Sequence, residues 1–151
     1  MLDALLQPDQ VYCRIEAASR KRVLQFVSEQ LAGVGVPADD LFDGLLERER
    51  LGSTGLGDGV AIPHCRAAFS SIRVCLLTTA EPVDYEAVDG EKVDIFFVLI
   101  VPNDEHQLHL RALAELSTTL DLAENRQRLR TCNDPASLHQ TMLKLLSECT
   151  A

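Results

Sequence analysis

The chain has 151 residues, of which 46% are hydrophobic and 25% charged, which predicts one globular domain over residues 1–151 and excludes a disordered chain. A formal net charge of −9 excludes a non-specific nucleic-acid surface or an anionic-membrane surface, because both need clustered Lys and Arg. The charge is better suited to a basic protein partner.

The first two predicted elements are a strand and a helix. Val, Tyr and Ile stand among polar residues over 11–17, which is typical of a strand. Ser19 stands at the cap position of a helix predicted over 20–32, and Gly33 ends this helix.

A second helix begins at Pro37 and leads into a glycine-rich loop. Leu41, Leu45 and Arg48 recur on one face of this helix, so Arg48 is expected at the C-terminal end of an apolar stripe. The segment 51–59 contains four glycines and no helical period, which predicts a loop.

Three strands are expected after the loop. Ile62 precedes Pro63 and is therefore biased toward extended geometry, which predicts a short strand that ends at His64. Segments 72–79 and 93–101 predict two longer strands, and the second is apolar on both faces, as expected for a central strand of a covered sheet.

The C-terminal part is predicted to be helical. Asp104 can cap a helix over 105–122, and Asp134 a last helix, with a short helix over 124–130 between them. Four residues of the first of these helices share one stripe: His109, Leu113, Leu116 and Leu120. Strands alternating with helices predict an α/β fold, a three-layer sandwich with helices on both faces of a mixed β-sheet.

One block of the sequence is more specific than these patterns. Residues 48–64 read RERLGSTGLGDGVAIPH, and VDIFFVLIVP at 93–102 is followed by His109 and Leu110. These segments resemble the IIA domains of the mannitol, fructose and nitrogen-regulatory branches of the bacterial phosphotransferase system, and the resemblance covers nearly the whole chain. The motif RERLGSTG and the expected single domain are most similar to the nitrogen-regulatory branch.

The resemblance implies a phosphohistidine carrier, a phosphotransferase component whose main role is regulatory. His64 would carry the phosphate on Nε2, Arg48 matches the family's active-site arginine, and His109 matches its second histidine. Arg48 could instead complement the dipole of its own helix, and His109 could be an ordinary core histidine.

The chemistry of these residue types supports such a role. Imidazole is nucleophilic at neutral pH, where much of it is uncharged. Phosphoryl transfer needs positioning, and donors or positive charge around three equatorial oxygens. Four residues of the loop fit that demand and are the predicted phosphate-binding residues: Ser53, Thr54, Gly57 and Gly59. The two hydroxyls could equally cap the loop.

Two positions depart from the usual pattern of the family. Cys65 follows the histidine where glycine is common, and would place a thiol beside the phosphate. Asp58 stands where asparagine is common, and would add a negative charge near a site for a dianion.

Two other functions remain open from the sequence. The first is a sugar-specific IIA component that passes phosphate to a IIB partner and thence to fructose or mannitol. The second is a zinc-binding module, since His106 and His109 at i, i+3 could join His64 and Cys65 in ligating zinc. In the leading interpretation we expect no metal and no cofactor.

The resemblance also implies the partners. They are an HPr-like or NPr-like phosphocarrier as donor, and regulatory targets such as potassium transport or sensor proteins. The five cysteines have no CxxC spacing and the N-terminus lacks a basic segment ahead of an apolar run. We therefore expect reduced thiols and a cytoplasmic protein that neither inserts into membranes nor binds nucleic acid.

Overall fold

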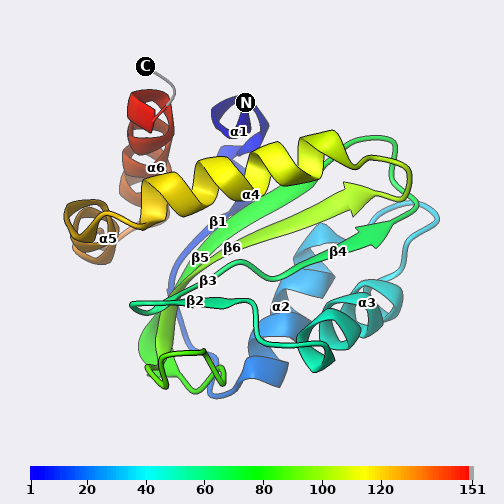
Figure 1. The fold of residues 1–151 in the computed structure, drawn as a ribbon, viewed down its shortest axis with the longest axis horizontal. Coiled ribbons are helices and arrows are strands. Elements are labelled where there is room, and N and C mark those ends of the chain that lie inside the picture. The colour runs from blue at the N-terminus through cyan, green and yellow to red at the C-terminus, as the bar shows by residue number, and fades with distance from the viewer. Residues whose placement is uncertain (150–151) are drawn as a thin grey trace.

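The computed structural model describes residues 1–149, in which one mixed sheet lies between two layers of helices (Figure 1). The strands are β1 (Val11–Ile15), β2 (Gly55–Gly57), β3 (Val60–Ala61), β4 (His64–Ala67), β5 (Arg73–Val83) and β6 (Val93–Pro102). The helices are α1 (Leu2–Leu5), α2 (Arg20–Leu31), α3 (Ala38–Arg50), α4 (Gln107–Leu120), α5 (Ala123–Arg130) and α6 (Pro135–Cys149), with a 3-10 turn at Pro8–Gln10. The predicted three-layer α/β sandwich is confirmed.

β6 is the central strand of the sheet. β5 pairs antiparallel with one edge of β6 and in turn pairs parallel with β1. Both β3 and β4 pair parallel with the other edge of β6, one after the other, and β2 joins β3 as an antiparallel hairpin. Pro63 separates β3 from β4, because proline has no N–H to donate to a neighbouring strand.

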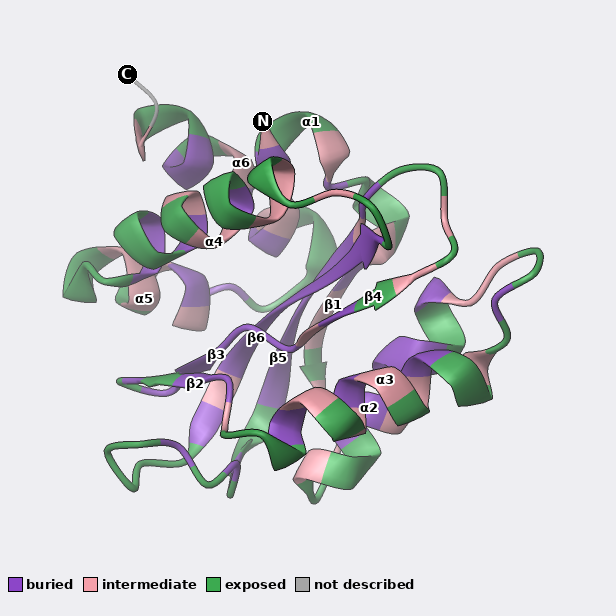
Figure 2. Ribbon diagram, turned by 45° about the vertical axis from the view of Figure 1, so that its right-hand side comes forward, coloured by how far each residue is buried: buried purple, intermediate pink, exposed green. Residues whose placement is uncertain are grey.

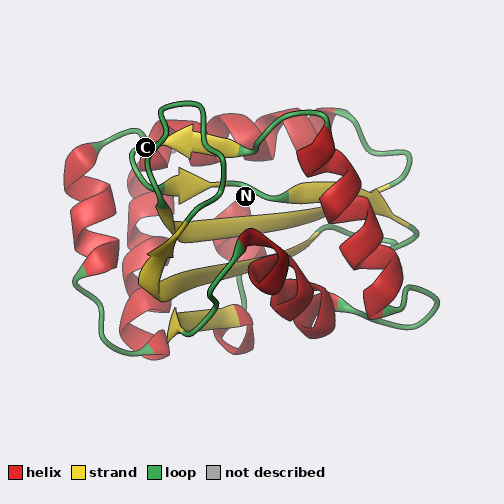
Figure 3. Cartoon of the chain, turned by 90° about the horizontal axis from the view of Figure 1, so that it is seen from below, coloured by secondary structure: helices red, strands yellow, loops and turns green. Residues whose placement is uncertain are grey.

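The core has two halves, one on each face of the sheet. Residues of β6 alternate between them, as the two-residue period of a strand requires. Ile95, Phe97 and Leu99 pack on the side of α1, α4 and α6. Phe96, Val98 and Ile100 pack on the side of α2 and α3, which cross the near face of the sheet in Figure 3. Figure 2 shows the buried strands between the inward faces of both helical layers.

The segment around His64 differs from its prediction. His64 begins strand β4 instead of ending a strand. The predicted loop 51–59 contains the hairpin strand β2, which pairs with β3. These strands have only two to four residues, and β2 is mostly glycine, so they carry no hydrophobic alternation that a sequence pattern could detect.

The helix caps and stripes were predicted with mixed success. Ser19 accepts a hydrogen bond from the Arg22 N–H, and Asp134 accepts one from the Ser137 N–H, as expected of N-caps. Asp104 is not the cap of α4, because that helix begins three residues later and His106 occupies the N-cap position without a capping hydrogen bond.

The buried stripe of α3 also ends at a different residue. It consists of Leu41, Leu45 and Glu49, at i, i+4 and i+8, while Arg48 beside it is half-buried. On α4 the buried residues are Ala112, Leu116, Thr119 and Leu120, so the predicted stripe is rotated and His109 lies at its margin, half-buried. Neither helix, nor any other over residues 1–149, is both long and apolar enough to span a membrane.

Candidate active site

His64 is placed by its register on the central strand. It pairs with Leu99 of β6, and directly paired residues of neighbouring strands point to the same face of a sheet. Leu99 belongs to the core on the α4 side. His64 therefore faces the layer that contains α4, and so does Arg66 two residues later, whereas Cys65 between them faces α3.

Two neighbours determine which nitrogen of His64 is free. Nδ1 lies 2.7 Å from the carbonyl oxygen of Ile62, which can only accept a hydrogen bond. Nε2 lies 3.2 Å from Nε of Arg48, which can only donate one. In the neutral ring Nδ1 therefore carries the proton, and Nε2 carries the lone pair.

Arg48 reaches His64 from the opposite helical layer. It lies in the last turn of α3, which packs against β4. In addition to the contact with His64, its Nη1 donates to the Gly52 carbonyl oxygen at 2.8 Å. A group that arrives at Nε2 of His64 would therefore meet a guanidinium already held in place.

His109 completes the group of three predicted side chains. It lies in the first turn of α4, and its ring meets the His64 ring edge to face, with centroids 5.1 Å apart and planes at 88°. Its Nδ1 is buried, and no atom of residues 1–149 forms a hydrogen bond with it. Since buried polar atoms are nearly always paired, this nitrogen lacks the partner expected of it among the described residues.

These side chains share a pocket of about 530 Å³. Its lining residues are Gly44, Glu47, Arg48, Leu51, His64, Cys65, Arg66 and His109. Arg66 was not among the site residues predicted from the sequence. Its spacing of two from His64 along a strand was the signal that could have found it, because such residues share a face.

Arg66 connects the pocket to the loop that precedes α4. Its Nη1 donates to the carbonyl oxygens of Pro102, at 3.2 Å, and of Glu105, and its Nη2 lies 3.2 Å from Nδ1 of His106. The same guanidinium therefore ties β4 to the start of the helix that carries His109.

The surroundings of both histidines favour the neutral form of the ring. Burial lowers the pKa of His64 below its ordinary value, and the positive charges of Arg48 and Arg66 lower it further, against the hydrogen bond to Ile62, which raises it. Burial also lowers the pKa of His109, and the nearby His64, Arg66, Arg48 and His106 lower it further. A neutral imidazole is the nucleophilic form.

The zinc site suggested by the sequence is not assembled. Over residues 1–149 no group of three or more His, Cys, Asp and Glu side chains is placed to hold a metal ion. His106 is exposed and contacts Arg66, and Cys65 packs on the other face of the sheet from His64. The i, i+3 spacing of His106 and His109 does not place both side chains on one helical face, because His106 is the N-cap residue and precedes the first helical turn.

Ser53 and Thr54 are occupied within the protein. Ser53 Oγ donates to the Tyr85 carbonyl oxygen at 2.9 Å and accepts from the Gly55 N–H. Thr54 is buried, and its hydroxyl and backbone N–H both donate to Glu49. The structure places neither hydroxyl in the pocket of His64.

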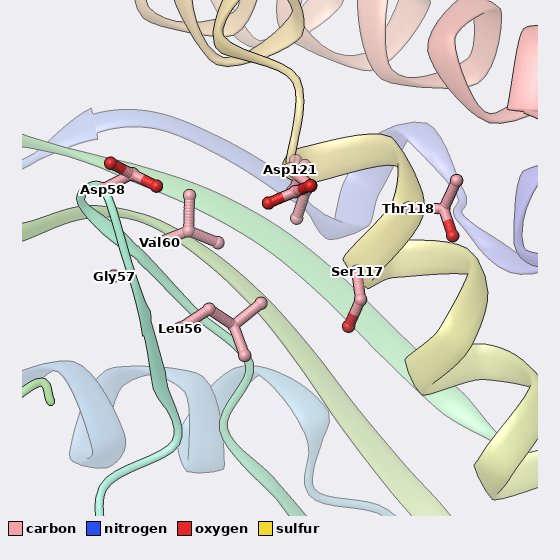
Figure 4. A pocket seen from close by; sticks show the side chains of 8 residues that line it. Leu56, Gly57, Asp58, Val60, Ser117, Thr118 and Asp121 are labelled. Atoms are coloured by element: carbon pink, nitrogen blue, oxygen red, sulfur yellow. The ribbon is translucent and has the colours of Figure 1, made fainter.

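Gly57 and Gly59 lie far from His64, at the turn of the β2–β3 hairpin. Val60 pairs with Ile95 of β6, four residues before the partner of His64, which is about 13 Å along a strand. Gly57 lines a different pocket, of about 380 Å³, between the hairpin and the C-terminal half of α4 (Figure 4). The structure does not bring these glycines to His64.

The two departures from the family pattern lie in different parts of the structure. The Cys65 thiol packs against Gly44 of α3, and burial raises its pKa to about 12, so it is an unreactive thiol. Asp58 lies at the hairpin turn, where Arg126 Nη2 is 3.9 Å from its carboxylate. Asp58 therefore lies with Gly57 and Gly59 at the hairpin, whereas Cys65 lines the pocket of His64.

The fold and pocket define a class of protein: an α/β sandwich that presents a histidine, with the lone pair of its neutral ring on Nε2, beside an arginine and a second histidine. Comparison with known proteins gives the family. Residues 4–145 match the family described as "Phosphoenolpyruvate-dependent sugar phosphotransferase system, EIIA 2", and the chain belongs to this family.

Named relatives lie in two branches of the family. A nitrogen regulatory protein of Pseudomonas aeruginosa is 37% identical over 145 residues, which cover 94% of each chain. A fructose-specific EIIA component of Haloferax volcanii is 31% identical over 134 residues, 87% of this chain and 84% of the relative. The crystal structure of the nitrogen regulatory protein IIA-Ntr of Neisseria meningitidis superimposes with a TM-score of 0.89 at 31% identity, covering 93% of this chain and 98% of that one. The predicted resemblance is confirmed.

Proposed function

We propose that the protein is a phosphoryl carrier that accepts a phosphoryl group on Nε2 of His64. The observation that carries this proposal is the pair of contacts on the imidazole, with the Ile62 carbonyl at Nδ1 and the Arg48 donor at Nε2. They leave Nε2 as the nucleophilic atom, in a pocket with two arginines and a buried nitrogen without a partner among the described residues.

The transfer is an in-line displacement at phosphorus. The donor is a phosphohistidine on a phosphocarrier protein of the HPr or NPr type. The lone pair of Nε2 forms the new P–N bond while the P–N bond of the donor breaks, and its electron pair returns to the donor imidazole. The phosphoryl charge is spread over three oxygens, which must be balanced by the acceptor site.

The pocket supplies that balance from its own side chains. The Arg48 N–H that now points at Nε2 can shift to a phosphoryl oxygen without leaving the pocket, because Gly52 holds the other arm of the guanidinium. Protonated at the buried nitrogen, His109 can donate to a second oxygen. We do not assign phosphate binding to Ser53, Thr54, Gly57 or Gly59, given their positions.

The role we propose for the carrier is regulation, through partners that distinguish its two phosphorylation states. The likeness to nitrogen regulatory proteins over 94% of both chains supports this role. Targets such as potassium transport or sensor proteins remain an implication of the family. A sugar-specific role is the second candidate, because a fructose-specific relative is 31% identical, and it would require onward transfer to a IIB protein.

Incubation with a phosphocarrier, its enzyme I and phosphoenolpyruvate tests the proposal. The native protein should gain the mass of one phosphate, and His64→Ala should gain none. The bond should be labile in acid and stable in base, as a P–N bond is. Phosphate that survives acid, or that appears on His64→Ala, would contradict the assignment. Subsequent loss of the label to a IIB protein, but not to water, would select the sugar-specific role.

A further inference from the structure

Within this proposed function, we infer that Glu49 is a positioning residue, which acts through the segment 51–54 to hold Arg48 against His64. Glu49 follows Arg48 in α3 but lies on the buried stripe of the helix. It is a buried carboxylate that the transfer step itself does not use.

The carboxylate of Glu49 is surrounded by donors. Its side chain is 1% exposed. It accepts hydrogen bonds from the Thr54 hydroxyl, from the Thr54 backbone N–H at 3.1 Å, and from the Tyr85 hydroxyl at 2.9 Å. Arg20 Nη1 lies 4.0 Å away. A buried charge is retained only when donors of this kind replace water, so the group forms or breaks as a unit.

A continuous chain of contacts runs from this carboxylate to the nucleophile. Glu49 fixes Thr54, which lies two residues after Gly52. The Gly52 carbonyl oxygen accepts from Nη1 of Arg48, and Nε of the same side chain donates to Nε2 of His64. Ser53 strengthens the link through its hydrogen bond to the Tyr85 carbonyl.

The chain of contacts explains the use of polar residues at a helix end. After the last turn of α3 the main chain turns toward β2 within a few residues, and Gly52 adopts φ of +146°. Without Glu49 this turn would be anchored by fewer contacts, and the carbonyl that orients Arg48 could move. Displacements of about 1 Å in a positioning group can slow a reaction on the order of a hundredfold.

A double-mutant cycle tests the inference on the rate of phosphoryl transfer at saturating donor. We expect Glu49→Gln to slow the step about tenfold and Arg48→Gln about a hundredfold. If Glu49 acts through Arg48, the double variant should be no slower than Arg48→Gln alone. Two effects that multiply, or a normal rate in Glu49→Gln, would overturn the inference.

Asp94→Asn is the matched control. Asp94 is also a carboxylate paired with an arginine, Arg130 at 3.0 Å, but it lies at the end of β6 remote from His64. The Asp94→Asn variant loses one negative charge, as Glu49→Gln does, but should leave the transfer rate unchanged. An equal slowing in Asp94→Asn would show a general effect of destabilisation and would count against Glu49.

Tyr85→Phe keeps the inference testable if Glu49→Gln does not fold, because it removes one donor and no charge. If Tyr85→Phe loosens the hold on Arg48, the positive charge of Arg48 is no longer fixed beside His64. The pKa of His64 should then be higher than in the native protein and closer to its value in Arg48→Gln. NMR titration of the unphosphorylated protein measures this pKa. An unchanged pKa would reject the inference whether or not His64 takes phosphate. A native protein that takes no phosphate, with the pKa shifted as expected, would reject the proposed function alone.

Discussion

At the scale of single residues, the chemistry of the pocket depends on which imidazole nitrogen is free. The Ile62 carbonyl occupies Nδ1 of His64 at 2.7 Å, so an electrophile can approach only at Nε2. The same backbone contact fixes the plane of the ring. A backbone carbonyl is suited to this purpose because no substitution of a side chain can remove it.

The first residue-scale prediction concerns Arg48. Arg48→Gln should slow phosphoryl uptake about a hundredfold, because a charge-assisted contact to the transferring group is worth about 2–4 kcal/mol. The pKa of His64 should rise at the same time, since a positive charge beside the imidazole disfavours its protonation. Uptake and NMR titration of one variant test both effects. If neither changes, Arg48 only complements the helix dipole.

The second concerns His109. His109→Ala should still accept phosphate on His64, but more slowly, by about 1–3 kcal/mol in the barrier, the range for a charged acceptor short of one donor. Its buried Nδ1 is the donor that would be lost. Quench-flow labelling compares the rates. Label on His109 in a His64→Ala protein would reverse the assignment of the two histidines.

At the scale of elements, the β2–β3 hairpin is expected to affect the stability of the fold but not the rate of phosphoryl transfer. Gly59→Ala should lower the free energy of unfolding by about 1–2 kcal/mol, because Gly59 has φ of +82°. A Cβ there would also collide with Arg130, which pairs with Asp94. Urea denaturation measures the loss, and we expect phosphoryl uptake by the folded protein to stay normal.

Gly35→Ala is the control for that variant. Gly35 has φ of +79° but open space around its Cβ, so it carries the backbone cost without the collision. Gly59→Ala should therefore be the less stable of the two. A slower uptake in Gly59→Ala alone would restore the phosphate-binding role that the sequence suggested for this glycine.

The elements also show how far sequence reasoning extends. Long periodic segments such as α2 and β6 were predicted to within two residues at each end, since they bury one stripe or two faces. The grouping of His64, Arg48 and His109 at one site was predicted from the family resemblance, and the three side chains lie together in the structure. Ser53 and Thr54 were assigned to phosphate because hydroxyls in a glycine-rich loop fit that role. The helical pattern did not mark Glu49, the partner of Thr54, as buried, and the partner of Ser53 is Tyr85, 32 residues away.

At the scale of the whole molecule, the acidic residues are unevenly distributed around the pocket of His64. The residues that line this pocket include two arginines and one acidic residue, Glu47. However, Asp39 and Asp43 are exposed at i, i+4 before Glu47 on α3, so a negative stripe leads along that helix to the pocket. The basic partner expected from the net charge would meet this stripe.

Uptake from a subsaturating donor should accordingly slow as salt rises, because screening becomes effective beyond about 8 Å at physiological ionic strength. The double variant Asp39→Asn, Asp43→Asn should reduce the dependence on salt. Glu124→Gln, on the exposed surface of α5, should not. A rate that is flat between low and physiological salt would mean that the donor contact is mainly apolar.

The pocket is built from both helical layers. Arg48 comes from α3 on one face of the sheet, while His109 comes from α4 on the other, and they meet at His64 on the outer edge of β4. A chain in which only one layer has docked on the sheet has half of the pocket. Under the proposed function, competence to receive phosphate is a property of the completed fold, and a partner that binds only the phosphorylated carrier thereby selects an intact one.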